Sequence, residues 1–305
     1  MENAVHSNIA ECILLSGGLD TSIVAAIASR YTKLHGITVC LKDAPDERFA
    51  KLIADRFQLH HSIVRIDEND AIAATHDAVK IMLSFDPMEV RNDASILIGL
   101  RKAGALGFKE VLTGDAGDEL FAGYSFLFNK DRDDLRRSLA DMWKIMRFFS
   151  VPLAKSLGMH SNLSFMDPEF KEFAQKIPVE LKVRQEQGRV YGKWILRKAF
   201  EHTLPDETTW RVKMPIEQGS GTSILPAYFN NSILEAEFKA KREYYWQSDK
   251  VRIRDREHLF YYEAYRRMFG APAGKGEGKK TCPDCSVRVP EGRNYCRTCG
   301  AYPVE

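Results

Sequence analysis

The segment from Ile13 to Ser22 constrains the fold of this chain more than any other. An apolar stretch of strand length (residues 13–15) runs into a serine and two glycines, and a helical pattern follows from Thr21 to Tyr31. Such a succession leaves free backbone N–H groups and the positive end of a helix dipole facing any anion that lies there. The segment therefore predicts a phosphate-binding loop. The alternative interpretation is an ordinary glycine turn between a strand and a helix.

The loop has its own signature. It lacks the lysine of a Walker A sequence, and its spacing is too short for that motif. Its pattern, SGG-x-D-[ST]-S, instead resembles the pyrophosphate loop of the ATP-pyrophosphatase superfamily, which cleaves ATP to AMP and pyrophosphate. The resemblance implies that the nucleotide is bound by Ser16, Gly17, Gly18, Leu19, Asp20, Thr21 and Ser22.

The overall composition is that of a soluble globular protein. The chain has 305 residues, of which 44% are hydrophobic and 28% are charged, enough for one large domain or two ordinary ones. A net charge of +2 gives no electrostatic reason to expect nucleic-acid or membrane binding. No apolar stretch approaches the length of a membrane span, and the N-terminus lacks the pattern of a signal peptide. We therefore expect a cytoplasmic enzyme.

Strand and helix signals alternate in the first part of the chain, which predicts an α/β fold with a parallel sheet. The expected strands are Glu11–Leu15, Ile37–Leu41, Ser62–Ile66 and Glu110–Thr113. The expected helices between them are Thr21–Tyr31, Asp46–Phe57 with Asp46 as cap, Ala71–Leu83 and Asp93–Leu106.

From about Asp131 the strand signals fade, and we expect a helical second half packed on the sheet. Its amphipathic segments are Asp134–Phe149, Glu169–Lys176, Lys193–His202 and Ile233–Phe269. Residues 271–280 are small, charged and glycine-rich, which predicts a flexible linker. The expected domains are thus a body over residues 1–270, the linker, and a small module over residues 281–305.

The last module contains four of the six cysteines. Cys282, Cys285, Cys296 and Cys299 form two C-x-x-C pairs, the pattern of a structural Cys₄ zinc ribbon. Two disulfides are the competing interpretation, which a reducing compartment disfavours. Cys12 and Cys40 lie in apolar segments, where we expect buried thiols.

A second glycine-rich motif, residues 112–124, also follows a predicted strand. In a parallel sheet it lies at the same carboxyl edge as the Ser16 loop, where ligands of such sheets bind. It carries three acids, Asp115, Asp118 and Glu119, and carboxylates beside a triphosphate need a cation between them. Asp20 and Asp118 are the natural Mg²⁺ pair. The alternative makes the acids helix-cap residues on a surface loop.

Together, SGGLDTS and TGDAGDELFAGY resemble the synthetase domain of glutamine-dependent asparagine synthetases, a scaffold shared with β-lactam synthetases. The resemblance covers roughly residues 11–221 in family order, including residues 44–47, the two histidines at 60 and 61, and the segments 193–197 and 210–213. It implies the fold of the PP-loop ATP-pyrophosphatases (adenine nucleotide α-hydrolase-like).

The resemblance also implies roles for single residues. It places Leu15, Val39, Thr113 and Gly114 in the nucleotide pocket, and Asp20 and Asp118 on magnesium. Lys193 matches the lysine that stabilises charge at the adenylated intermediate, a role that a fixed cation performs without proton transfer. Asp115 and Arg91 are the further catalytic candidates. Arg197, Arg211 and Lys213 are weaker candidates for contacting phosphate or a carboxylate.

Two features depart from the family pattern. Asp115 stands where the family usually has a glutamate. The shorter side chain either sits farther from the ammonia or the intermediate, or leaves room for a larger acyl substrate than aspartate. The family's glutaminase domain begins with a cysteine after the initiator methionine, whereas Glu2 follows Met1 here. We therefore expect the nitrogen to come from free ammonia, a separate glutaminase subunit or an amine substrate.

The leading hypothesis is an ATP-dependent ligase that adenylates a small-molecule carboxylate and transfers it to ammonia or an amine, with asparagine formation as the first specific candidate. ATP, Mg²⁺ and structural Zn²⁺ are the expected cofactors. One alternative is a PP-loop ATPase that modifies tRNA or protein through an adenylated intermediate. Another is a nucleotide-binding scaffold whose zinc ribbon docks a partner, either a protein or RNA.

Overall fold

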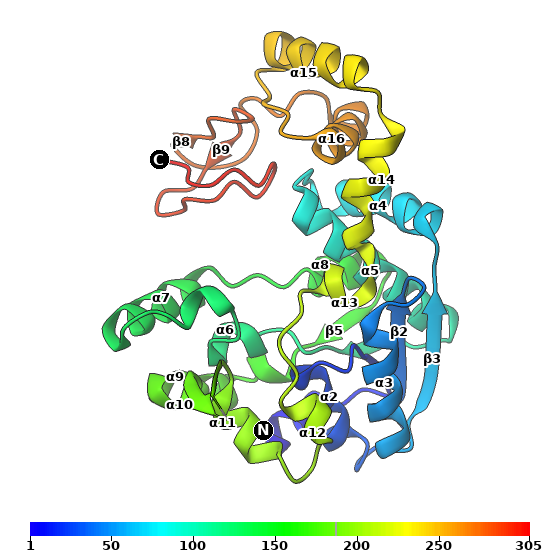
Figure 1. Ribbon diagram of the computed structural model, residues 1–305, viewed down its shortest axis with the longest axis vertical. Coiled ribbons are helices and arrows are strands. Elements are labelled where there is room, and N and C mark those ends of the chain that lie inside the picture. The colour runs from blue at the N-terminus through cyan, green and yellow to red at the C-terminus, as the bar shows by residue number, and fades with distance from the viewer. Residues whose placement is uncertain (187) are drawn as a thin grey trace.

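A five-stranded parallel sheet forms the centre of the molecule (Figure 1), whose computed structural model describes residues 1–186 and 188–305. The strand order is β3-β2-β1-β4-β5. The strands are β1 (Cys12–Leu14), β2 (His35–Cys40), β3 (His60–Arg65), β4 (Glu110–Leu112) and β5 (His160–Asn162). Because the chain moves to β2 on one side of β1 and to β4 on the other, the point where the order reverses lies at the carboxyl end of β1. The predicted α/β class is confirmed.

Helices cover both faces of this sheet and form most of the second half (Figure 1). In the first half they are α1 (Glu2–Ser7), α2 (Leu19–Ala28), α3 (Pro45–Arg56), α4 (Glu68–Met82), α5 (Pro87–Ala105), α6 (Gly117–Phe121), η1 (Ser125–Leu127), α7 (Arg132–Ile145) and α8 (Ser150–Ser156). In the second half they are η2 (Ser164–Met166), α9 (Pro168–Lys176), α10 (Val179–Lys182), α11 (Trp194–Phe200), α12 (Asp206–Thr209), α13 (Ile216–Ser220), η3 (Thr222–Ile224), α14 (Leu225–Ser232), α15 (Glu235–Asp249) and α16 (Arg256–Phe269).

The second half contains strands that the sequence did not reveal. Strand β5 extends the main sheet beyond β4, and β6 (Arg184–Glu186) pairs with β7 (Arg189–Tyr191) in an antiparallel hairpin. The second half is mainly helical as predicted, and these additional strands were not expected because strands of three residues are too short to show an alternating pattern.

Several helix limits also differ from the prediction. The long segment expected over 233–269 is two helices, because Lys250 ends α15 in the left-handed conformation (φ 56°) and Asp255 caps α16 through the N–H of His258. Helix α5 begins six residues before the expected Asp93, at Pro87, a residue suited to the first helical turn. Helix α3 starts after Ala44, so the expected cap, Asp46, lies in its first turn instead.

Helix α2 is the most deeply buried element of the core. Eight of its ten residues are buried, among them Ile23, Val24 and Ile27, which are fully inaccessible to solvent. A helix buried on nearly all sides holds its N-terminus rigidly. The loop before α2 is thereby fixed at the carboxyl edge of the sheet.

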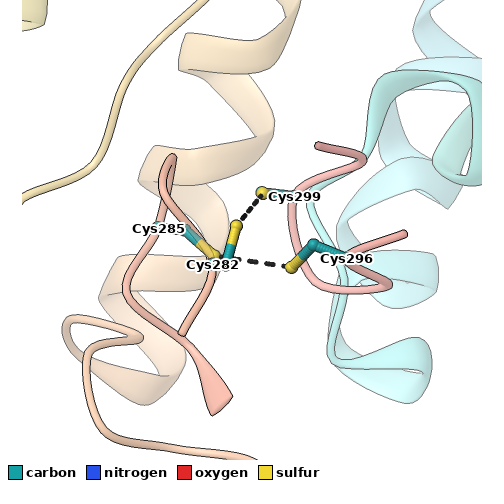
Figure 2. Close-up of side chains that lie close together, drawn as sticks. All are labelled: Cys282, Cys285, Cys296 and Cys299. Atoms are coloured by element: carbon teal, nitrogen blue, oxygen red, sulfur yellow. Dashed lines mark hydrogen bonds between the residues drawn. The ribbon is translucent and has the colours of Figure 1, made fainter. Parts of the chain in front are cut away.

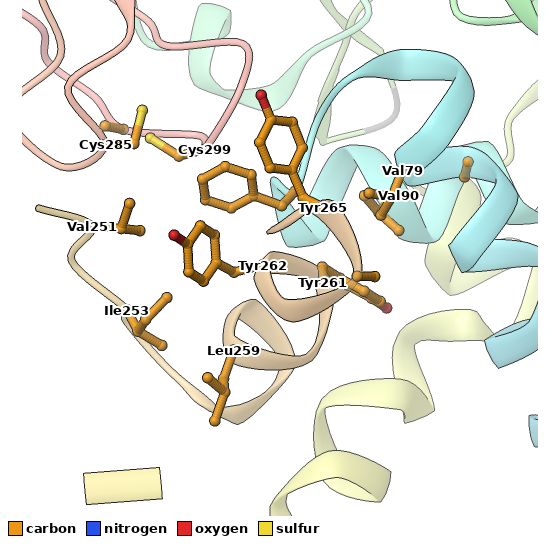
Figure 3. Close-up of a cluster of buried hydrophobic side chains, with 14 of the residues drawn as sticks. Val79, Val90, Val251, Ile253, Leu259, Tyr261, Tyr262, Tyr265, Cys285 and Cys299 are labelled. Atoms are coloured by element: carbon orange, nitrogen blue, oxygen red, sulfur yellow. The ribbon is translucent and has the colours of Figure 1, made fainter. Parts of the chain in front are cut away.

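The cysteine-rich end of the chain packs against the body of the molecule. Its short hairpin of β8 (Lys280–Thr281) and β9 (Arg288–Val289) carries the cysteines into a cluster shared with Tyr262 and Tyr265 of α16 (Figure 3). The N–H of Phe85 donates to the carbonyl of Thr298 (2.7 Å). The module therefore folds back on the body in this structure.

Residues 271–280 also contact the cysteine-rich module. The N–H of Gly274 donates to the carbonyl of Ser286 (2.9 Å), and the carbonyl of Lys275 accepts from Arg288 (2.7 Å). The limits proposed for the three domains stay a prediction. Within the described residues, no helix has the length and apolar character that a membrane crossing requires.

Candidate active site

The Ser16 loop joins β1 to α2 in a tight turn. Gly17 has φ 66°, and a Cβ there would lie 2.3 Å from the backbone carbon of Phe49, so only glycine fits. The Ser16 hydroxyl accepts from the N–H of Gly18 (3.2 Å) and lies 3.2 Å from the Thr21 hydroxyl. Gly18 is the N-cap of α2. The loop thus has the strand, glycine turn and helix N-terminus that a phosphate site needs.

The second glycine-rich loop lies directly against the first. A Cβ on Gly117 would lie 2.5 Å from the carboxylate carbon of Asp20, and one on Gly114 would lie 3.0 Å from the Asp20 Cβ. A larger residue at Gly117 would displace the Asp20 carboxylate from its position. The two motifs that the sequence places at one edge of the sheet therefore touch each other.

Lys193 connects the two loops although it lies far along the chain. Its ammonium contacts Asp20 Oδ2 and lies 2.8 Å from Asp118 Oδ1. Its side chain is 4% exposed. Desolvation opposes its charge, but Asp118 and Asp20 outweigh that effect and raise the pKa of Lys193. Lys193 is therefore a buried cation whose charge is balanced by two carboxylates.

The backbone at Lys193 is unusual. Its φ of 56° lies in the left-handed region, and its N–H donates to the carbonyl of Phe121 (2.8 Å). A lysine rarely adopts this conformation, and strained residues of this kind gather at functional sites. The turn directs the side chain under Gly123, where a Cβ would lie 2.4 Å from Lys193 Cε.

The carboxylates of Asp20 and Asp118 fit a magnesium site. Each has a buried Oδ1 that accepts no hydrogen bond of standard geometry. Desolvation opposes the ionisation of both carboxylates. Lys193 and Lys213 outweigh it at Asp118 and lower the pKa of that group, whereas at Asp20 desolvation prevails over Lys193 and the pKa is raised. Because Mg²⁺ needs only one or two carboxylates when phosphate oxygens and water complete its shell, this pair is sufficient.

The residues expected around the nucleotide lie on neighbouring strand ends. In the register of β1 with β2, Leu14 faces Ile37, so Leu15 comes opposite Thr38, one residue before Val39, towards the carboxyl edge. Thr113 and Gly114 directly follow β4, which pairs with the other side of β1. The predicted pocket residues are thus brought together.

Asp115 has a partner that sequence reasoning missed. The Ser150 hydroxyl donates to Asp115 Oδ2 (2.5 Å), and Ser150 is 1% exposed. Burial raises the pKa of Asp115, whereas the hydrogen bonds from Ser150 and Thr113 work in the opposite direction. Ser150 stands at the start of α8 in a segment without a motif, so no local signal could have identified it.

Arg211 holds the phosphate loop in place through hydrogen bonds. Its guanidinium donates to Asp46 (2.8 Å) and to the carbonyl of Ser16 (3.3 Å), and it lies over the Phe49 ring. Both members of the ion pair are nearly buried. Desolvation raises the pKa of Asp46, and Arg211 counteracts the shift. Asp46 therefore anchors an arginine, where the sequence predicted a helix cap.

Replacing Arg211 with methionine is expected to lower the free energy of unfolding by about 3 kcal/mol, because it leaves a nearly buried carboxylate unpaired. It should also raise the KM for ATP, since the Ser16 carbonyl loses its support. Chemical denaturation and steady-state kinetics measure the two effects. The Arg211→Met/Asp46→Asn double variant should recover part of the stability, and strict additivity of the two changes would contradict the pairing.

Two other predicted arginines point elsewhere. Arg91 pairs with Glu257 of α16 (2.5 Å), so in this structure it joins two helices and does not contact the loops. Arg197 donates to the carbonyls of Gly192 (3.0 Å) and Thr209. It therefore stabilises the backbone on either side of α11. Lys213, in contrast, lies 3.5 Å from Asp118 and above the Tyr124 ring.

The four cysteines of the terminal module converge on one point (Figure 2). All are buried, and their sulfur atoms lie within 4.8 Å of one another. The Cys282–Cys299 and Cys285–Cys296 pairs are each 3.6 Å apart, so the thiols are free and not joined as disulfides. A tetrahedral zinc with Zn–S bonds of about 2.3 Å sets sulfur atoms about 3.8 Å apart, so the cluster fits a zinc ribbon.

The remaining two cysteines are poor candidates for sulfur chemistry. Cys12 and Cys40 are both fully buried, as expected. Burial raises the pKa of Cys12 to about 12 and that of Cys40 to about 11. Neither forms the thiolate that nucleophilic sulfur chemistry requires at neutral pH.

Comparison with known proteins agrees with this geometry. The profile of the family described as "Asparagine synthase" matches residues 1–161 and 153–287. The chain is 31% identical over 296 residues to a "Probable asparagine synthetase [glutamine-hydrolyzing]" of Dictyostelium discoideum, covering 87% of this chain and 52% of that protein. It is 31% identical over 231 residues to "Asparagine synthetase [glutamine-hydrolyzing] 2" of Lotus japonicus, covering 68% of this chain and 39% of that protein. The chain thus spans about half the length of the first relative and less of the second.

Proposed function

The chain belongs to the asparagine synthase family, and from this membership we propose that it is an AMP-forming ligase that joins a carboxylate to ammonia or an amine. The observation that carries the proposal is the position of Lys193. Its buried ammonium lies between Asp20 and Asp118, where the two glycine-rich loops meet. A site with a phosphate loop, two acids for a cation and a fixed positive charge suits the release of pyrophosphate.

The chain's own residues supply positioning and electrostatics. The N–H groups at the start of α2 face the leaving pyrophosphate, and Lys193 stabilises the charge that develops at the α-phosphorus as the carboxylate attacks. Asp20 and Asp118 would hold Mg²⁺, which neutralises phosphate charge when it is bound. None of these groups transfers a proton, so the first step depends on orientation and fixed charge.

Asp115 is the candidate for the second step. Its buried carboxylate follows β4 at the same edge of the sheet, and Ser150 fixes its orientation. We assign it to the incoming nitrogen, which must lose a proton as it displaces AMP. Ammonia or a primary amine, free or delivered by a separate glutaminase subunit, is the proposed donor. Aspartate is the first acyl substrate to test.

The cysteine cluster is proposed to hold one structural Zn²⁺. Four sulfur ligands leave no open position for a reacting group, so this metal would stabilise the fold and take no part in the reaction. Among the possible modifications of tRNA, the insertion of sulfur has little support, because the two cysteines of the body are buried and their pKa values are raised.

The experiment is a pyrophosphate-release assay with Mg-ATP, a panel of carboxylates, and ammonia or amines. We expect release with aspartate and ammonia or with another acid–amine pair. Asp118→Asn should reduce the rate at least 100-fold, because it weakens cation binding and removes a charge that faces Lys193.

The matched control is Asp133→Asn, which removes an exposed carboxylate on α7 and should change the rate less than twofold. Circular dichroism checks that both variants fold. If wild-type protein released no pyrophosphate with any pair but bound ATP, the site would be that of a nucleotide-binding scaffold.

A further inference from the structure

The cysteine-rich module carries a cavity that the ligase reaction does not use. It has a volume of about 250 Å³ and lies between β9 and the second C-x-x-C turn. Its lining residues are Glu277, Val287, Arg288, Val289, Pro290, Arg293, Tyr295, Arg297 and Thr298. Arg297 also donates to the carbonyl of Ile145 at the end of α7 (3.2 Å), so the cavity opens near the junction of the module and the body.

The cavity is strongly basic although the module as a whole is not. Residues 275–305 contain six lysines and arginines against four acids, a small excess. Three of these six residues are arginines, and the fold brings all three around one cavity. Glu277 is the one acid among the residues that line it. Within residues 1–186 and 188–305, none of the three arginines forms an ion pair within 4.0 Å.

Arg288, Arg293 and Arg297 thus share the lining of one cavity. Like charges held together in this way are stabilised by a bound anion.

The remaining lining narrows the choice of anion. Pro290 and the Tyr295 ring are part-exposed beside the arginines, whereas Val287 and Val289 are buried, and the Tyr295 hydroxyl donates to Asp86 of the body. Arginine is the preferred partner of phosphate, and aromatic or apolar surfaces beside a basic groove receive bases of single strands. The volume exceeds that of a lone phosphate ion.

We propose that this arginine cavity binds a nucleotide unit, with its phosphate on Arg288, Arg293 and Arg297 and its base against Pro290 and the Tyr295 ring. The unit is either a free nucleotide or part of a single RNA strand. The inference does not rest on the proposed ligase activity, because none of the lining residues belongs to the candidate active site.

Fluorescence anisotropy with a 5′-labelled 12-nucleotide oligo(U) tests the proposal, using the full-length chain. Arg288→Gln/Arg293→Gln should weaken binding at least tenfold at 100 mM KCl. Because each phosphate contact to a single strand contributes about 0.7 to the salt slope, losing two contacts should lower that slope by about 1.4. Arg297 is left intact because it also holds the module to α7.

The control is Arg56→Gln/Arg189→Gln, which removes the same charge from two exposed arginines on other elements. It should alter binding less than twofold. Competition by millimolar UMP would identify a free nucleotide as the ligand, and its failure would identify the RNA strand. The proposal is overturned if the wild type does not bind RNA or UMP, if both double variants weaken binding equally, or if oligoglutamate displaces the RNA as well as UMP does.

Discussion

Replacing Lys193 with alanine is expected to reduce the rate of pyrophosphate release about 1,000-fold while ATP still binds. The reason is that Lys193 is a buried cation fixed between Asp20 and Asp118, so neither water nor a flexible side chain can replace it during the reaction. Removing one preorganised donor from such a site costs about 3 to 4 kcal/mol of transition-state stabilisation. Stopped-flow pyrophosphate detection gives the rate, and ATP binding is measured separately by calorimetry.

The matched control for this variant is Lys198→Ala in helix α11, whose N-cap residue is Lys193. Lys198 is half-exposed and pairs with Glu201 at 2.6 Å, away from both glycine-rich loops. Its loss should change the rate less than twofold. An equal effect of the two substitutions would show that Lys193 supports α11 and does not act on the reacting phosphate.

Removal of zinc is expected to have the largest effect on stability. Cys299→Ser, or treatment with a strong chelator, should unfold the cysteine-rich module, because structural zinc contributes about 10 kcal/mol of folding free energy in small domains. The module covers Tyr262 and Tyr265 of α16 (Figure 3), so its loss exposes these buried rings. Metal analysis should find one zinc per wild-type chain, and thermal unfolding of the variant should begin at a lower temperature.

The control is Cys40→Ala, which removes a buried thiol of the body. This variant should retain its zinc, because Cys40 lies outside the four-cysteine cluster. A wild-type chain that contains no zinc after metal-replete expression, and that unfolds at the same temperature with and without chelator, would contradict the structural role.

The parts of the site that local sequence patterns predict are those formed by neighbouring residues. The Ser16 loop was predictable because the strand, the glycines and the helix start follow one another within ten residues. The cysteine cluster was predictable because each C-x-x-C pair forms a turn with its own spacing. The sequence also predicted that the two glycine-rich loops lie at one edge of the sheet, because the carboxyl ends of parallel strands meet on one side.

Contacts between distant segments were not predictable in this way. Family resemblance singled out Lys193, but no pattern around it places its ammonium on Asp20, which is 173 residues away. Arg91 seemed suited to a substrate and instead pairs with Glu257, because packing brings α5 against α16. The partnership of Ser150 and Asp115 depends in the same way on how α8 lies beside the sheet.

The amino-acid sequence by itself thus determined the chemistry of the loop from Ser16 to Ser22, since hydrogen bonding and backbone freedom there are local properties. Only the tertiary structure decided that the Lys193 ammonium and the Arg211 guanidinium lie against that loop, and only it formed the arginine cavity of the cysteine-rich module. The physical reason is that these groups act through burial and mutual distance, which arise when remote segments pack together.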